Sequence, residues 1–245
     1  MLNQPRLAAA LAVELRKMIT GDLKPGDRMP SEKDLADQFG VSRNTVRESL
    51  LILWDEGLVV RKWGVGTFVR DSEQPITQSM STVVPVHEFM KTSSSKITLT
   101  SAKIEKVPCP DDAAAALSLE PGSEIWYIDR TFAFDGKPAF ILLDWVPLVV
   151  NGRPIDPTAL TSVEVGLLEL LREKAHCVIT RMEAQFSAVG ATEEQAARFG
   201  IDVGTPLIAD EQVSIDNAGE IAMFSRNYYH TAVSTLHLVR STRNS

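Results

Sequence analysis

The stretch PSEKDLADQFGVSRNTVRESLLILWDEGL, residues 30–58, decides the fold of the N-terminal part of the chain. Ser31 and Ser42 each precede a run whose apolar residues have helical spacing. A serine suits this N-cap position because its hydroxyl accepts a hydrogen bond from a free backbone N–H. Only Gly40 and Val41 separate the two runs, and glycine suits the left-handed position after a helix end. Two helices joined by so short a turn are predicted to form a helix-turn-helix.

The flanking sequence predicts one more helix and a hairpin. A helix is expected over residues 6–20, where apolar side chains recur at spacings of three and four: Leu7, Leu11, Leu15, Met18 and Ile19. After the helix-turn-helix, residues 58–61 and 67–70 are short β-type runs on either side of a glycine-containing turn. The hairpin is expected to form the wing of a winged helix-turn-helix.

Charge divides the chain into two parts. Residues 1–70 hold 11 Lys and Arg against 9 Asp and Glu, a net charge of +2, whereas the remaining 175 residues have a net charge of −9. Only the N-terminal part is therefore compatible with the phosphates of DNA. We expect a DNA-binding domain over residues 1–70, a Ser/Thr-rich linker over 71–95 and a second domain over 96–245.

The second domain has the pattern of an α+β fold with a mostly antiparallel sheet. Hairpin turns are predicted at Asp135-Gly136 and at residues 217–219. Strands are expected over residues 97–107, 124–134, 138–148, 178–189, 207–215 and 220–229 and near 236–240. Helices are expected over residues 113–117, 165–174 and 193–199, and the linker is expected to contain one short turn at 86–90.

Several classes of protein do not fit this sequence. The longest apolar run, residues 141–143, ends at Asp144, so no membrane span is predicted. The N-terminus does not have the pattern of a secretory signal, which favours a cytoplasmic protein. Cys109 and Cys177 have no CxxC spacing and are expected to be reduced thiols. The four histidines are scattered, so neither a metal site nor a cofactor is predicted.

The second helix of the helix-turn-helix carries the residue types that read DNA. Its core-facing side is predicted to hold Val46, Leu50 and Leu53. Arg43, Asn44 and Arg47 occupy a neighbouring strip; Arg can bind guanine and Asn adenine through two hydrogen bonds. The hydroxyls of Ser42 and Thr45 are suited to phosphates. The alternative is that the arginines merely solvate a helix surface, but the capped helix, tight turn and basic wing together favour DNA binding.

The motifs of residues 30–58, with the wing residues Gly64-Val65-Gly66-Thr67-Phe68-Val69, resemble the winged-helix domain of the GntR family of regulators. The resemblance covers residues 6–70. It implies that Arg43 and Arg47 read bases, that Lys33 contacts the DNA backbone and that the wing tip at Gly64 approaches the minor groove.

Two positions depart from that family pattern. Lys33 stands where arginine is usual and cannot form arginine's bidentate contact. Val65 stands where a wing-tip arginine is common, so the minor-groove contact is expected either to be weaker or to come from Lys62. The candidate DNA-binding residues are Ser31, Lys33, Ser42, Arg43, Asn44, Thr45, Arg47, Lys62, Gly64, Gly66 and Thr67.

The C-terminal part resembles the UTRA ligand-binding domain of the HutC subfamily, whose fold is similar to chorismate lyase. The matching segments include Leu119-Glu120-Pro121-Gly122, Asp135-Gly136-Lys137-Pro138 and Gly204-Thr205-Pro206-Leu207. The resemblance implies effector binding, with Arg130 at an anion-binding position and Tyr229 in the pocket. The same part of the chain, residues 95–245, is expected to hold the homodimer together. Other pocket positions of sugar-phosphate sensors are apolar here, which argues against a phosphosugar: Phe132, Leu142, Leu168 and Met223.

Arg130 interrupts an otherwise apolar side of its predicted strand, so its charge requires a partner. That partner is either an internal carboxylate, with Asp144 or Asp129 nearest in sequence, or an anionic group of a ligand. In the second case Asn227 and Tyr229 would bind the rest of the ligand. The candidate effector-binding residues are Arg130, Asp144, Asn227 and Tyr229.

The sequence therefore predicts a repressor that a small anionic metabolite releases from its operator. A homodimer on a near-palindromic site is expected, because one recognition helix covers few base pairs. Two alternatives remain. An enzyme with a chorismate-lyase-like fold would need converging acid and base groups, which the sequence does not show. A ligand-independent DNA-binding protein would leave the large acidic domain without a role.

Overall fold

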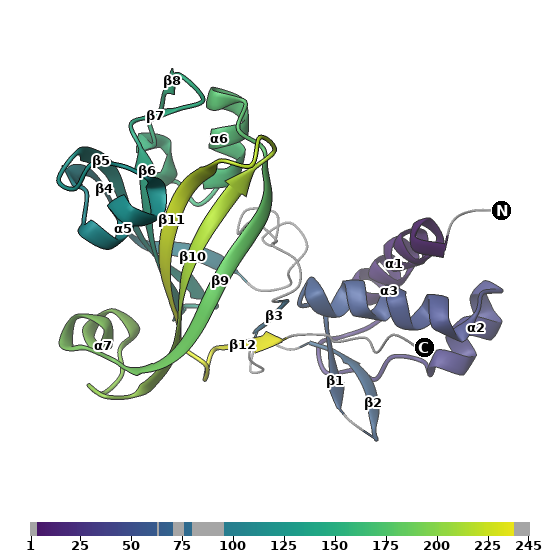
Figure 1. Ribbon diagram of the computed structural model, residues 1–245. Helices are drawn as coiled ribbons and strands as arrows, with labels where there is room; N and C mark the ends of the chain where they lie inside the picture. The colour runs from purple at the N-terminus through teal and green to yellow at the C-terminus, as the bar shows by residue number, and fades with distance from the viewer. Residues whose placement is uncertain (1–3, 63, 71–75, 80–95, 238–245) are drawn as a thin grey trace, which may run out of the picture. The chain divides into compact units, whose positions relative to one another are not determined.

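The computed structural model describes residues 4–62, 64–70, 76–79 and 96–237, and the chain forms two compact units (Figure 1). The first comprises Met1–Val84, Glu88–Ser95 and Ser234–Ser245, and the second comprises Pro85–His87 and Lys96–Val233. The turn expected at residues 86–90 and most of the expected linker lie outside the described residues.

The first unit begins with three helices, α1 (Gln4–Gly21), α2 (Glu32–Phe39) and α3 (Arg43–Asp55). The predicted caps are confirmed: the hydroxyl oxygen of Ser31 accepts a hydrogen bond from the backbone N–H of Asp34 at 3.2 Å, and that of Ser42 from Thr45 at 3.1 Å. Gly40 ends α2 with a φ of 65°, a left-handed conformation that favours glycine. The predicted helix-turn-helix is confirmed.

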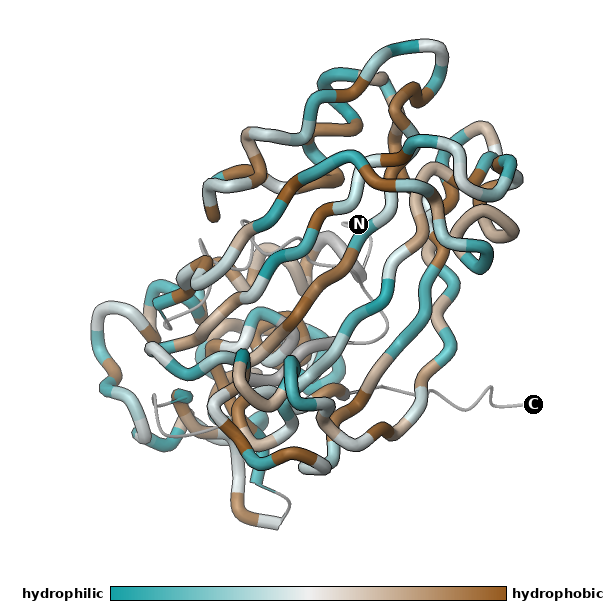
Figure 2. The backbone as a smooth tube through the Cα atoms, turned by 90° about the vertical axis from the view of Figure 1, so that its left-hand side faces the viewer, coloured by the Kyte–Doolittle hydropathy of each residue, from teal (hydrophilic) through white to brown (hydrophobic). Residues whose placement is uncertain are grey.

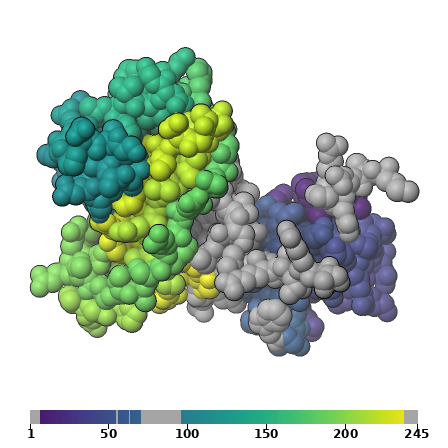
Figure 3. All heavy atoms as spheres, viewed as in Figure 1, coloured from purple at the N-terminus to yellow at the C-terminus, as the bar shows by residue number. Residues whose placement is uncertain are grey.

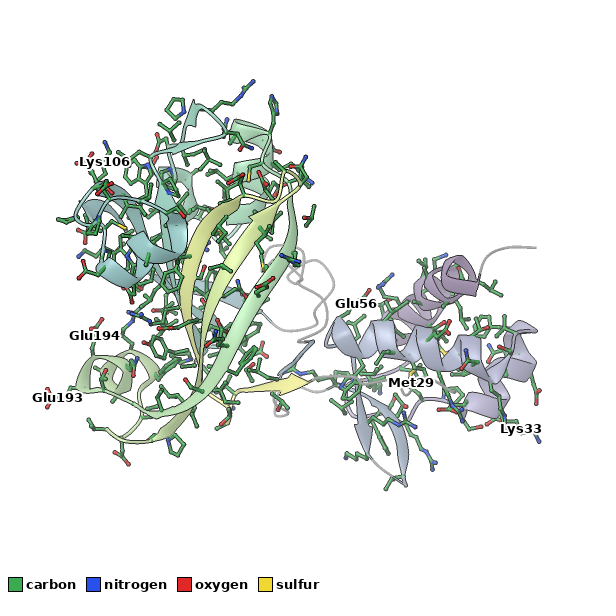
Figure 4. The ribbon with its side chains drawn as sticks, viewed as in Figure 1. Met29, Lys33, Glu56, Lys106, Glu193 and Glu194 are labelled. Carbon is green, nitrogen blue, oxygen red and sulfur yellow. The ribbon has the colours of Figure 1, made fainter. Side chains whose placement is uncertain are left out.

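A hairpin follows, formed by β1 (Val59–Lys62) and β2 (Gly66–Val69). The backbone N–H of Met29 donates to the carbonyl of Thr67 at 2.8 Å, which ties the segment before α2 to the hairpin. Met29 lies between α3 and the hairpin, whereas Lys33 extends outward from α2 (Figure 4). The three helices and the hairpin share one core: Leu11, Ala12, Leu15, Ile19, Met29, Leu35, Ala36, Val46, Leu50, Leu53, Leu58, Val59 and Val69.

Two further strands of the first unit come from distant parts of the chain. β3 (Ile76–Ser79) and β12 (Ser234–His237) form a two-stranded parallel sheet. β3 lies within the segment expected as a linker with one short turn, and residues 234–237 lie outside the second unit, in which the sequence had placed them. The short, polar segment of residues 76–79 has little periodicity of its own, and the strand depends on a partner more than 150 residues away in sequence.

The second unit is built on a six-stranded sheet with the order β4-β5-β6-β11-β10-β9, in which every neighbouring pair is antiparallel. The strands are β4 (Ile97–Pro108), β5 (Glu124–Phe134), β6 (Lys137–Pro147), β9 (Ile179–Gly190), β10 (Pro206–Asp216) and β11 (Ile221–Tyr229). The predicted α+β class is confirmed. Figure 2 shows hydrophobic and hydrophilic residues mixed along these strands, as expected where side chains alternate between two faces.

Helices cover both faces of this sheet. α5 (Asp111–Leu117) packs on Ile125, Trp145 and Phe224, and α7 (Glu193–Phe199) packs on Ile141 and Leu207 of the same face. In Figure 3 these helices leave a strip of the later strands visible between them. The opposite face packs through Ile128, Val146 and Met223 against α6 (Leu167–Ala175) and η1 (Thr158–Thr161), near the short pair β7 (Val149–Val150) and β8 (Arg153–Pro154).

Replacing Leu53 with alanine should destabilise the first unit by about 2–5 kcal/mol, because the Leu53 side chain is fully buried and its loss leaves a cavity. Hydrogen exchange read separately on α3 and on β5 would measure the change. Leu171→Ala, in the core of the second unit, is the matched control and should show the reverse pattern. Equal acceleration of exchange in both units by Leu53→Ala would contradict two separate cores.

Candidate nucleic-acid interface and effector site

The first turns of α3 present polar side chains opposite a buried side. Val46 and Leu53 are fully buried, whereas Arg43, Asn44 and Arg47 are exposed. The buried side of α3 is bonded to α1, because the hydroxyl of Ser49 donates to a backbone carbonyl of α1 at 2.8 Å. The structure therefore brings the three predicted base-reading residues to one exposed strip.

Arg47 is held by a residue that the sequence interpretation missed. Its Nε donates to Oε2 of Glu32 at 2.7 Å, and Arg61 of β1 lies 3.7 Å from the other oxygen of the same carboxylate. Asn44 donates to Glu48, one turn further along α3, at 2.9 Å. Glu32 stands beside the predicted contact Ser31, but its partners are 15 and 29 residues away, so no local pattern reveals the pairing.

Thr45 differs from its predicted role. Its side chain is only 2% exposed, and its hydroxyl shares a hydrogen bond of 2.9 Å with that of Ser42. Both groups thus stabilise the start of α3, and Thr45 does not present its hydroxyl to a phosphate. Ser42 remains exposed beside the helix terminus.

The wing tip is an exposed turn that a hydrogen bond from Arg28 stabilises on one side. Gly64 has a φ of 72° and open space around it, and Val65 is 52% exposed. Arg28 donates through Nη2 to the carbonyl of Val65 at 2.6 Å, and a side chain at Gly66 would meet this guanidinium at 3.0 Å. Gly66 thus leaves room for Arg28, a residue that the sequence interpretation missed.

The remaining predicted DNA contacts surround this strip. Ser31 and Lys33 are exposed at the start of α2. Lys62 is exposed at the end of β1, with its ammonium group 4.7 Å from the centre of the Phe68 ring. Thr67 is half-buried, and its carbonyl is already bonded to the segment before α2.

The four predicted effector residues lie on one face of the six-stranded sheet. Arg130 of β5 lies opposite Leu142 of β6, and Leu142 lies opposite Asn227 of β11. Arg130 is 6% exposed, and its Nη2 donates to Asp144 at 3.2 Å. Of the two partners left open for Arg130, the internal carboxylate is therefore present, and it is Asp144. Asp129 points to the other face and pairs with Arg198 of α7.

A second buried carboxylate, which the sequence interpretation missed, completes the group. Asp210 of β10 is 2% exposed and accepts hydrogen bonds from Asn227 at 2.8 Å and from Tyr229 at 2.7 Å. Ser225 donates to Asp144 at 2.6 Å. Asp210 lies two residues after Ile208, so side-chain alternation along the strand predicts that both face the same side of the sheet. Only the pairing of β10 with β11 places Asp210 beside Asn227.

The electrostatics of this buried polar cluster are unbalanced, with two carboxylates and one guanidinium. Burial raises the pKa of Asp210 above its ordinary value near 3.8, and the charge of Asp144 adds to the rise, whereas the hydrogen bonds from Tyr229 and Asn227 oppose it. Burial, and then the charge of Asp210, raise the pKa of Tyr229 well above 10. Within the described part of the chain, no group accepts a hydrogen bond from Nε of Arg130.

The described residues contain no group of three or more side chains suited to a metal ion. Among the helices that the structure describes, none has the length and apolarity needed to cross a membrane.

Comparison with known proteins assigns both parts of the chain. Residues 94–233 match the UTRA domain, and residues 7–69 match the bacterial regulatory proteins of the gntR family. Among curated relatives, the mannosyl-D-glycerate transport/metabolism system repressor MngR of Escherichia coli is 26% identical over 96% of both chains. The transcriptional repressor NagR of Bacillus subtilis is 26% identical over 85% of this chain and 84% of its own.

The structure of PhnF from Mycobacterium smegmatis is similar in fold, with a TM-score of 0.60 and 23% identity over 95% of this chain and 100% of that one. MngR and NagR are both named as repressors, and the gntR family model describes bacterial regulatory proteins, so the comparisons assign the chain to regulators and not to enzymes. The chain therefore belongs to the GntR family of bacterial transcriptional regulators, in the HutC-type group that joins a winged helix-turn-helix to a UTRA domain.

Proposed function

We propose that the start of α3, the start of α2 and the wing form the operator-binding surface of a transcriptional repressor. The observation that carries this proposal is the exposure of Arg43 and Arg47 on a helix whose opposite side is buried. Arg43, Asn44 and Arg47 would contact base edges in the major groove. The positioning contacts to the DNA backbone and minor groove would come from Ser31, Lys33, Ser42, Lys62, Gly64, Gly66 and Thr67.

The repressor is proposed to act as a homodimer on a near-palindromic operator, in the cytoplasm. A single recognition helix contacts few base pairs, and two-fold operators match two-fold proteins. The net charge of −9 on the residues after 70 supports a division of labour, because this part would be repelled by DNA.

The effector is proposed to bind at the buried polar cluster of Arg130, Asp144, Asp210, Asn227 and Tyr229. An anionic group of a small metabolite would accept hydrogen bonds from the guanidinium N–H groups of Arg130 that Asp144 does not use. Because two carboxylates lie nearby, the same molecule must also offer hydrogen-bond donors, such as hydroxyls. The name of the E. coli relative mentions mannosyl-D-glycerate, a hydroxylated carboxylate of this class.

A short covalent route connects this cluster to the first unit. Tyr229 ends β11, residues 230–233 follow, and β12 then pairs with β3. An effector shifts DNA affinity only if it binds two conformations of the protein unequally. A change in β11 would reach β12 through four residues, which makes β12 the proposed link between effector binding and operator release.

Replacing Arg47 with alanine should relax base preference at one operator position and cost about 1–3 kcal/mol of binding free energy, because a base contact is lost. Replacing Lys33 with alanine should weaken binding to all sequences alike and reduce its salt dependence. Fluorescence anisotropy on an operator and on scrambled DNA measures both. Arg47→Ala with wild-type affinity and selectivity would show that α3 does not read the operator.

Arg130→Met should retain operator binding but lose release by effector. The experiment screens anionic metabolites (carboxylates, phosphate esters and phosphonates) for operator release by the wild type, and then tests the active compound on the variant. Arg198→Met breaks a comparable ion pair on the opposite face of the sheet and should respond like the wild type. A normal response of Arg130→Met would remove Arg130 from the effector site.

The stability of the chain should depend on pH through Asp210. Because the folded-state pKa of Asp210 lies above its unfolded value, the native state binds this proton more tightly than the unfolded chain. The resulting stabilisation is full below the unfolded pKa and is lost as pH rises through the folded pKa. The unfolding free energy of the wild type minus that of Asp210→Asn should fall as the pH rises above the ordinary value near 3.8. Urea denaturation measures it, and a constant difference would refute the burial argument.

A further inference from the structure

Glu32 places a negative charge within the surface proposed to bind DNA. It is the first residue of α2, and its neighbours in sequence are the proposed DNA contacts Ser31 and Lys33. Its side chain remains 26% exposed and lies against two arginines from different elements, Arg47 of α3 and Arg61 of β1. A carboxylate at such a surface repels phosphate, so it lowers affinity for every DNA sequence. Its contacts with the two arginines indicate a role that offsets this loss of DNA affinity.

The contact between Glu32 and Arg47 uses only one part of the guanidinium. Nε of Arg47 donates to Glu32 at 2.7 Å, whereas none of the described residues accepts a hydrogen bond from its terminal nitrogens. The Arg47 side chain is 58% exposed, so these two nitrogens are available to a base. An unrestrained arginine loses rotamer entropy when a base contact fixes its side chain, and a charge-assisted hydrogen bond at Nε reduces that loss.

The second oxygen of Glu32 connects this arrangement to the wing. Oε1 of Glu32 lies 3.7 Å from Nη2 of Arg61, in the first strand of the hairpin. One carboxylate thus joins the recognition helix, the helix before it and the wing. The first turn of α2 also contains Asp34, whose side chain accepts a hydrogen bond from Ser31, so the helix terminus does not depend on Glu32 alone for a negative charge.

We propose that Glu32 is a positioning residue for DNA sequence specificity: it holds Arg47 at Nε so that the terminal nitrogens meet one base, and it ties this arrangement to the wing through Arg61. The inference rests on the proposed function, in which Arg47 reads the operator. Glu32 then lowers affinity for DNA in general while raising the preference for one base over the others.

The test compares the full-length wild type with Glu32→Gln, Arg47→Ala and the matched control Asp37→Asn. Asp37 is an exposed residue of α2, so its amide variant removes the same charge from the same helix. Each protein selects binding sites from a random pool of duplex DNA, and sequencing gives the base preference at every position. Thermal denaturation confirms that each variant is folded.

Glu32→Gln should lose base preference by roughly 5-fold or more at the position where Arg47→Ala loses it, and only there. Asp37→Asn should keep the wild-type preference. Both amide variants should bind random DNA more tightly by a similar factor, because each removes one negative charge. A wild-type base preference in folded Glu32→Gln would overturn the inference.

A second variant covers the case in which Glu32→Gln does not fold. Glu32→Asp keeps the charge at the start of α2 but is shorter by one methylene, so it cannot reach both arginines. It should also lose preference at the Arg47 position, and an unchanged preference would overturn the inference. A wild type that selects no sequence at all would instead refute the proposed function, so the two failures are distinguishable.

Discussion

The burial of one side of α3 constrains everything else in the first unit. Val46 and Leu53 have no exposed surface, so the rotation of the helix about its axis is fixed. The far end is fixed as well, since Arg16 of α1 lies 2.6 Å from Glu56. The exposed strip of Arg43 and Arg47 is therefore a consequence of the core. A rotated helix would expose leucines, which costs about 25 cal/mol for each Å² of apolar surface.

Charge pairs have different consequences in the two units. Glu32 and Arg47 are partly exposed, and such a pair contributes little to stability, so its effect is expected on geometry and specificity. Arg130 and Asp144 are both more than 90% buried, so removal of either partner leaves a costly unpaired charge. Asp210 adds a second carboxylate on the same face. The second unit thus retains charged and polar groups in its interior, and burying them costs free energy that an apolar core would not cost.

Local signals predicted most of the fold, and distant pairings account for what was missed. The caps at Ser31 and Ser42 depend on residues three positions away, and strand alternation depends on neighbours, so the sequence predicted these elements well. Glu32, Asp210 and the β3–β12 pair depend on partners in other elements. Thr45 shows the reverse error: its residue type suits a phosphate contact, but its burial assigns it to the cap.

A crystal structure of the full chain bound to its selected operator tests the central claim most directly. The account predicts that α3 enters the major groove, with the terminal nitrogens of Arg47 within hydrogen-bond distance of a base edge. It also predicts that Nε of Arg47 still contacts Glu32 in the complex. A complex in which Arg47 contacts only phosphates, or in which α3 lies outside the major groove, would contradict the account.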